Sequence, residues 1–186
     1  MQAEFANDEH RAQGEELLLE LGRFAVAFER VCESMRHVII SAFQSEGLRQ
    51  QGLARVVIGD KTSAELQVLL GALVGELRAR TDDADQKAVH ALLKEVKELG
   101  EARNVVIHSS WSFGKNAAFA ELYATAIRPR TKQNQGAVPE IHGMSAGYLC
   151  RLTETSNALQ IKLDRLRNCI IRNDLKIATE LARDVS

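Results

Sequence analysis

The chain has 186 residues, of which 45% are hydrophobic and 26% are charged, with 24 basic and 25 acidic side chains. This length fits a single domain, 1–186, and the apolar fraction argues against global disorder. A net charge near zero excludes a chain that is basic throughout, although a local basic surface stays compatible with it. Two prolines and 5% aromatic residues argue against a β-sandwich and favour an all-α fold.

Several absences from the sequence indicate a cytoplasmic protein. No run of 18 apolar residues is long enough to span a membrane, and the polar start MQAEFANDEH has no apolar segment typical of a secretory signal. Cys32, Cys150 and Cys169 are odd in number and far apart, as expected for reduced thiols. Because the sequence has no compact Cys/His cluster and no Gly-rich phosphate loop, we expect neither a metal nor a cofactor.

A polar lead-in over 1–13 is followed by a first long helix. Its apolar residues recur at steps of three and four, which marks one helix face: Leu17, Leu21, Phe24, Phe28, Val31, Met35, Val38 and Ala42. The glycine-containing stretch 45–63 predicts a connection. Thr62 and Glu65 have the spacing of a capping box, which predicts a second helix from that point.

A third helix is expected from about Asp83, where Gln86 again gives capping-box spacing, to about His108. The following stretch, 111–143, predicts an irregular segment or a short β-hairpin, with a loop around Pro129 and Pro139. A penultimate long helix has regular three-four spacing from Leu149 to Ile170, and a bundle helix is favoured over a dimeric coiled coil.

A short terminal helix follows the penultimate one, with Asn173 or Asp174 as its cap. The predicted fold is therefore an all-α bundle of four to five helices. The first, third and penultimate helices are the long ones.

The third helix changes character towards its end. The face that begins with Leu92 and Val96 continues through Gly100 to Asn104 and His108, and so turns polar. Arg103 lies on the neighbouring apolar stripe, where a charge needs a polar partner or a route to solvent. Arg103 and His108 are five residues apart, roughly 140° around an ideal helix, so Arg103 has to reach around the helix or act across an interface.

The string EARNVVIHSSW, residues 101–111, resembles the signature of the HEPN superfamily (higher eukaryotes and prokaryotes nucleotide-binding domains). Ribonucleases of that family are helical bundles that carry an arginine, four to six further residues and then a histidine. The resemblance implies catalytic roles for Arg103, Asn104 and His108. It also implies a homodimer whose two motifs share one cleft, an RNA substrate, and a place among toxins with an antitoxin or among phage-defence effectors.

This resemblance implies a metal-independent endoribonuclease in which the RNA 2′-hydroxyl attacks the adjacent phosphate. Some family members carry a tyrosine two residues after the histidine, where this chain has Ser110, so control by nucleotide transfer to that position is not implied. The alternative function is a non-catalytic HEPN-like helical module that binds a nucleotide, an RNA or a protein partner.

Each of these residues also has a structural interpretation. His108 can cap the carboxyl end of its helix, where the helix dipole favours it. Arg103 can form an ion pair with Glu98 or Glu101, and Trp111 is expected to be a packing residue rather than a platform for base stacking.

The best candidates for contact with RNA outside the motif are basic residues in the segment after the third helix. They are Lys115, Arg128, Arg130 and Lys132. A solvated loop is the competing interpretation of the same residues.

Overall fold

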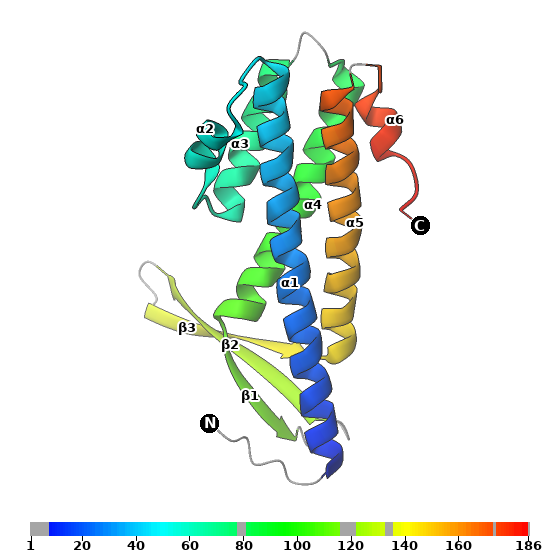
Figure 1. Cartoon of the computed structure of the whole chain (residues 1–186). Coiled ribbons are helices and arrows are strands. Elements are labelled where there is room, and N and C mark those ends of the chain that lie inside the picture. The colour runs from blue at the N-terminus through cyan, green and yellow to red at the C-terminus, as the bar shows by residue number, and fades with distance from the viewer. Residues whose placement is uncertain (1–7, 78–80, 116–121, 133–135, 173, 186) are drawn as a thin grey trace. The chain divides into compact units, whose positions relative to one another are not determined.

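The computed structural model describes residues 8–77, 81–115, 122–132, 136–172 and 174–185, with side chains for all of these except 112–141 (Figure 1). The chain divides into two compact units. Unit 1 comprises residues 1–26 and 101–154, and unit 2 comprises residues 27–100 and 155–186. Three long helices, α1 (Asp8–Ser45), α4 (Asp83–His108) and α5 (Ala146–Ile171), contribute residues to both units.

The described residues form six helices, which confirms the predicted helical bundle with long first, third and penultimate helices. The remaining three are short: α2 (Gln51–Ile58), α3 (Ser63–Glu76) and α6 (Ile177–Leu181). Helix α2 lies in the stretch that the sequence predicted to be only a connection, and that prediction is wrong. Its helical spacing is visible in the buried side chains of Ala54 and Ile58, four residues apart. Within the described residues, no helix combines the length and apolar character needed to cross a bilayer.

The core of unit 2 lies between the long helices, where α1 and α5 run side by side (Figure 1). Their predicted apolar faces are buried, including Met35, Val38, Leu163 and Leu166. Polar contacts join the same helices: Ser34 Oγ donates to Asp164 Oδ1 at 3.4 Å, and Arg167 Nε donates to Ser41 Oγ at 3.3 Å. Lys162 of α5 pairs with Glu95 of α4 at 2.7 Å. These contacts fix the orientation of each helix about its own axis, so that its apolar face is directed at the core.

The helix ends in unit 2 are closed by local hydrogen bonds. The capping box of α3 is confirmed, since Glu65 N donates to Thr62 Oγ1 and Thr62 N donates to Glu65 Oε2. Helix α1 ends at Gly47, whose φ of +98° suits glycine, and the bonds Gly47 N to Gln44 O and Leu48 N to Phe43 O form a Schellman motif.

The cap of α4 is one residue earlier than the predicted one. Asp82 Oδ1 accepts from Asp85 N at 2.9 Å, so Asp82 and not Asp83 is the capping residue. This hydrogen bond, with a smaller contribution from Lys176, lowers the pKa of Asp82 below its ordinary value. Asp174 was one of the two residues predicted to cap α6. In the structure, the backbone N–H of Ala178, in the first turn of α6, donates to Asp85 Oδ1 of α4 at 2.8 Å. Residue 173 lies outside the described residues.

Unit 1 contains a three-stranded antiparallel sheet in the order β1-β2-β3, formed by β1 (Ser110–Lys115), β2 (Leu122–Lys132) and β3 (Gly136–Met144) (Figure 1). The strand prediction is therefore correct for the described part of 111–143, and the expected loop around the prolines is wrong; residues 116–121 and 133–135 lie outside the described residues. Pro129 is paired directly with Pro139. Because both lack an N–H, their pairing suits a position where opposed residues exchange no hydrogen bonds.

The amino end of α1 extends further than expected. Residues 8–13, predicted as part of a polar lead-in, belong to α1, and His10 among them is buried. Residues 1–7 of the lead-in lie outside the described residues.

The capping box of α3 predicts a measurable fall in stability on substitution. Thr62→Ala removes the hydroxyl that accepts from Glu65 N, and we expect the free energy of unfolding to fall by about 1 kcal/mol. Urea denaturation of the full chain measures this difference. Ser63→Ala, one residue later, is the matched control and is expected to change stability by less than about 0.5 kcal/mol.

The capping box of α3 also makes the stability difference between the wild type and Thr62→Ala depend on pH. Hydrogen bonds from Thr62 lower the pKa of Glu65 below its ordinary value of 4.5. The stability gained from that lowering is present above pH 4.5 and is lost as the pH falls through the folded-state pKa. The gap between wild type and Thr62→Ala should therefore narrow in acid, and a gap that widens would contradict the capping role of Glu65.

Candidate functional site

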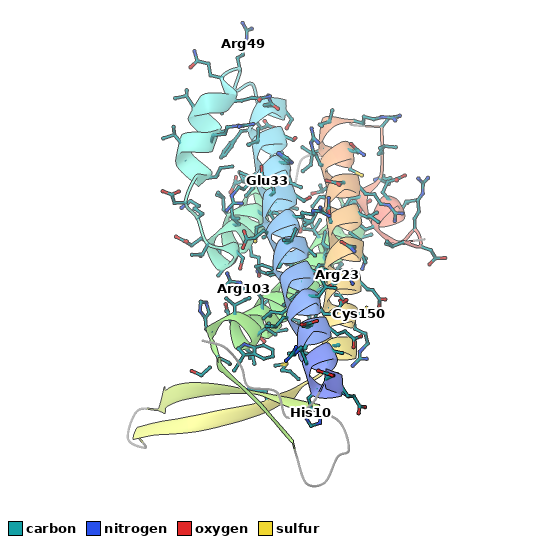
Figure 2. The ribbon with its side chains drawn as sticks, turned by 60° about the horizontal axis from the view of Figure 1, so that its bottom comes forward. His10, Arg23, Glu33, Arg49, Arg103 and Cys150 are labelled. Carbon is teal, nitrogen blue, oxygen red and sulfur yellow. The ribbon has the colours of Figure 1, made fainter. Side chains whose placement is uncertain are left out.

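The motif predicted from the sequence lies in the last two turns of α4, within unit 1. Val106 is fully buried there and anchors the turn to the core. Arg103 is half-buried, whereas Asn104 and His108 are exposed. Figure 2 shows Arg103 where α4 ends and the sheet of unit 1 begins. The helix end thus presents a polar surface built on a buried apolar residue.

Arg103 reaches around the helix to the histidine. Its Nη1 atom lies 3.0 Å from His108 Nε2 and donates to Asn104 Oδ1 at 3.4 Å. The roughly 140° between positions 103 and 108 is therefore bridged by the length of the arginine side chain. The structure brings all three predicted residues of the motif together, and the guanidinium is the centre of the cluster.

The contact bears on which imidazole nitrogen carries the proton. A guanidinium offers only N–H donors and stays protonated at any pH relevant to proteins. As a hydrogen bond, the contact needs His108 Nε2 as its acceptor, which corresponds to the tautomer with the proton on Nδ1. In that tautomer the side chain presents an unprotonated nitrogen beside a permanent positive charge.

The capping role suggested for His108 is filled by other side chains. Ser109 Oγ donates to Val105 O, and Trp111 Nε1 donates to Val106 O at 2.8 Å. These two bonds satisfy carbonyl groups that the helix end leaves without helical partners. Trp111 is half-buried and serves the helix end, in agreement with its expected role in packing. Glu98 was one of the two acids predicted as ion-pair partners of Arg103. Its Oε1 atom forms an ion pair with Lys94 Nζ at 4.0 Å.

The four other predicted RNA-contacting residues lie on the sheet of unit 1, and their side chains are outside the described residues. Lys115 ends β1, whereas Arg128, Arg130 and Lys132 lie on β2. Ser110, two residues after His108, is the first residue of β1 and is paired with Ile127 on β2. Arg128, the next residue on β2, therefore lies beside the end of β1 that adjoins α4.

Lys115 is placed differently from these three residues. It is paired with Leu122, six residues before Arg128 on β2, which corresponds to roughly 20 Å along the strand. The register therefore places Arg128 next to the end of α4, with Arg130 and Lys132 continuing along β2 beyond the start of β1, in the direction opposite to Lys115.

Arg36 and His37 on α1, in unit 2, form another pair of nitrogen-bearing side chains. Both contact Glu33, at 3.3 Å and 3.2 Å, and Arg36 also donates to Lys61 O at 3.4 Å. Among the residues that the structure describes, no group of three or more His, Cys, Asp or Glu side chains is arranged to hold a metal ion.

No protein-family model, curated protein or solved structure matches the chain. A function therefore has to be inferred from the chemistry of its own side chains.

The sequence did not predict a pocket of about 270 Å³ in unit 2, between α3, α4, α5 and α6. Its polar residue, Asp85, is 2% exposed. The signal was present in the spacing, because Asp85 precedes the buried Val89 by four residues and Leu92 by seven. That spacing places a carboxylate on the apolar stripe of α4, where a polar group needs a partner.

The contact between Arg103 and His108 predicts a specific tautomer. Nitrogen-15 NMR of the histidine rings at pH 8 should show His108 with its proton on Nδ1. In Arg103→Ala the proton should move to Nε2, the site that a histidine side chain prefers in water. His90, exposed on the same helix, is the internal control and should not respond. A proton on Nε2 in the wild type would contradict the contact.

Proposed function

We propose that this chain is a metal-independent endoribonuclease of HEPN type that cleaves RNA through attack of a 2′-hydroxyl on the adjacent phosphate. One observation carries the proposal: the Arg103 guanidinium, which stays charged, lies 3.0 Å from His108 Nε2 at a solvent-exposed helix end. Phosphodiester transfer needs positive charge for the phosphorane and a group that moves protons near neutral pH, and these two side chains supply them.

In the proposed reaction, a base removes the 2′-hydroxyl proton and the O2′–P bond forms. The P–O5′ bond breaks, and an acid protonates the departing 5′-oxygen. The products are a 2′,3′-cyclic phosphate and a free 5′-hydroxyl, so the atoms balance without a metal or a second reactant. His108 Nε2, which carries the lone pair, is the base.

Substrate binding would make the lone pair on His108 Nε2 available for proton transfer. In the free protein, Arg103 donates to Nε2 and so occupies the base. A phosphate is a stronger acceptor than a neutral ring because its hydrogen bonds to arginine are charge-assisted. As the phosphate draws the guanidinium away, Nε2 becomes available to the 2′-hydroxyl, and Arg103 stabilises the charge that develops in the transition state. Asn104, bonded to the same Nη1, would orient the guanidinium.

The acid would come from a second copy of the chain. One chain supplies one imidazole at this helix end, and the neutral ring that acts as base cannot protonate the leaving oxygen in the same step. A two-fold homodimer would place a second His108 and a second Arg103 in one composite site. The homodimer, a cytoplasmic location and a role as a toxin or phage-defence effector, with an antitoxin or regulatory partner, all rest on the HEPN resemblance.

The basic positions on β2 provide a track for the substrate. Arg128, Arg130 and Lys132 alternate along one strand and therefore share one of its faces. They follow the Ser110–Ile127 pair at the end of β1 nearest to the motif. Phosphates of a single strand bound there would lead towards His108.

His108→Ala tests the catalytic role. We expect cleavage of a single-stranded RNA in excess chelator to fall by about 10²-fold or more, because the variant has no base. Helicity by circular dichroism and the oligomeric state by light scattering should not change, since the ring is exposed and does not cap the helix. Gel analysis of end-labelled RNA, with identification of the cyclic or 3′-phosphate ends, measures the result.

His90→Ala, on the exposed face of the same helix, is the matched control and should cleave as the wild type does. Cleavage that persists in His108→Ala would exclude the proposed base. RNA binding without cleavage by the wild type would instead support the non-catalytic module. The rate per chain should also fall on dilution once the dimer dissociates, and a rate independent of concentration in a monomeric protein would argue against the composite site.

Substitutions on the sheet test the track separately. Arg128→Ala with Arg130→Ala should weaken the binding of single-stranded RNA. The slope of log K against log salt should decrease by roughly 0.7 for each phosphate that the protein no longer neutralises. Lys115→Ala is the matched control, because the register places it at the opposite end of β1. Fluorescence anisotropy over a salt series measures both variants. An equal weakening of binding in the two would show that position on the sheet does not matter.

A further inference from the structure

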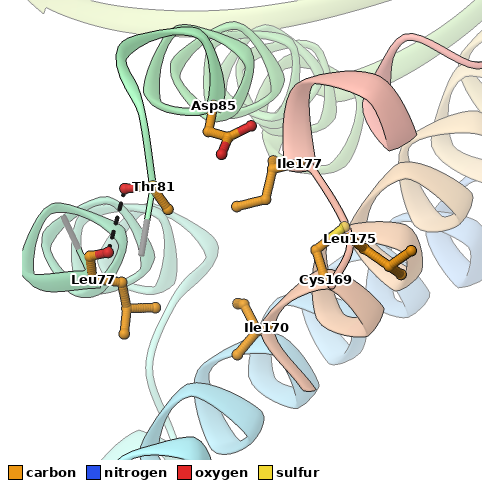
Figure 3. Close-up of a pocket in the computed structure, with 7 residues that line it drawn as sticks. All are labelled: Leu77, Thr81, Asp85, Cys169, Ile170, Leu175 and Ile177. Atoms are coloured by element: carbon orange, nitrogen blue, oxygen red, sulfur yellow. Dashed lines mark hydrogen bonds between the residues drawn. The ribbon is translucent and has the colours of Figure 1, made fainter. Parts of the chain in front are cut away.

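The pocket in unit 2 is separate from the motif of α4 in residues and in chemistry. Its volume is about 270 Å³. Most of the wall is apolar, formed by Leu77, Ile170, Leu175 and Ile177 (Figure 3). Pockets for drug-sized ligands begin at about 300 Å³, so this one suits a smaller molecule with an apolar body.

One buried carboxylate points into this apolar space. Asp85 is 2% exposed, and Figure 3 shows its side chain directed at the cavity. Its Oδ1 accepts a hydrogen bond from Ala178 N at 2.8 Å. A carboxylate has about four acceptor positions, so the group can accept from a ligand as well. A buried charge in an apolar wall favours a partner of opposite sign.

The other polar side chains of the wall are uncharged. Thr81 Oγ1 donates its hydrogen to Leu77 O at 3.3 Å, so this hydroxyl is engaged by the end of α3 (Figure 3). Burial raises the pKa of the Cys169 thiol to about 11, so the sulfur stays protonated and uncharged. Lys176, a cation in the neighbouring loop, is paired with Asp82 at 2.9 Å. Among the lining residues that the structure describes, Asp85 therefore supplies the one charged group. The pKa of Lys176 is raised by its hydrogen bond to Asp82 and, because Lys176 lies near enough, by Asp85 as well.

We propose that this pocket binds a small organic cation, an ammonium group on an apolar body of about the size of benzylamine, with the ammonium on Asp85 and the apolar body against Ile170 and Ile177. The carboxylate supplies the charge and the acceptor, and the aliphatic side chains of the wall contact the remainder of the ligand. An anion of the same shape is repelled by Asp85, and a neutral alcohol gains no charge pairing there.

A charge series on the wild-type protein tests the proposal. Benzylammonium, benzyl alcohol and benzoate share one shape and differ in charge. Each is titrated into the full-length protein at pH 7, and the methyl signals of Ile170 and Ile177 are followed by NMR. Benzylammonium should shift both signals and bind about tenfold or more tightly than benzyl alcohol, with benzoate weakest. Equal binding by all three, or no shift with any of them, overturns the proposal.

A pair of variants tests whether Asp85 supplies the negative charge that binds the ligand. Asp85→Asn keeps an oxygen that can accept from Ala178 N but removes the negative charge, and it should weaken benzylammonium binding by about tenfold or more. Asp83→Asn, an exposed acid in the same turn of α4, should bind as the wild type does. Wild-type affinity in a folded Asp85→Asn overturns the proposal. If that variant does not fold, the charge series decides alone.

Discussion

The charge of Arg103 constrains the carboxyl end of α4. Position 103 lies on a stripe that is otherwise apolar, and a guanidinium cannot be buried there without a polar partner. The aliphatic part of the side chain can follow the stripe while the charged end reaches His108 Nε2, 3.0 Å away. The packing requirement and the chemistry of the site are thus met by one contact. A shorter cation at this position could pack but could not span the same angle around the helix.

The way α4 ends decides what the imidazole can do. A histidine in the last turn of a helix commonly donates to a terminal carbonyl. Here Ser109 and Trp111 take that role by bonding Val105 O and Val106 O. Since β1 begins at Ser110, the chain turns away directly after the motif and leaves the ring exposed. The strand that follows the helix is therefore part of the reason that the His108 ring is exposed.

Periodicity predicted the long helices because each buries a continuous apolar face, and Thr62 with Glu65 predicted the start of α3. It did not predict α2, because Gly52 lies within this helix of eight residues and the spacing of Ala54 and Ile58 alone did not outweigh the glycines of the stretch. The pairing of Pro129 with Pro139 was also missed, because prolines in isolation indicate a loop and only the register shows that they oppose each other. The three residues of the motif were singled out by the polar end of their helix face and by the resemblance to the HEPN signature. Their contact was not, because an ideal helix gives Cα directions and not the reach of an arginine.

Asp85 and Arg103 show how the length of an ionisable side chain on an apolar helix stripe determines where its charged group lies. Both are ionisable residues on the apolar stripe of α4, and the spacing from Val89 and from Val106 makes this visible in the sequence. Arginine is long enough to carry its charge to the surface, and there it meets a ring. Aspartate is too short, so its carboxylate stays 2% exposed and is held by Ala178 N beside a cavity. The length of the side chain therefore determines whether the charged group of such a residue reaches the surface or stays in the interior.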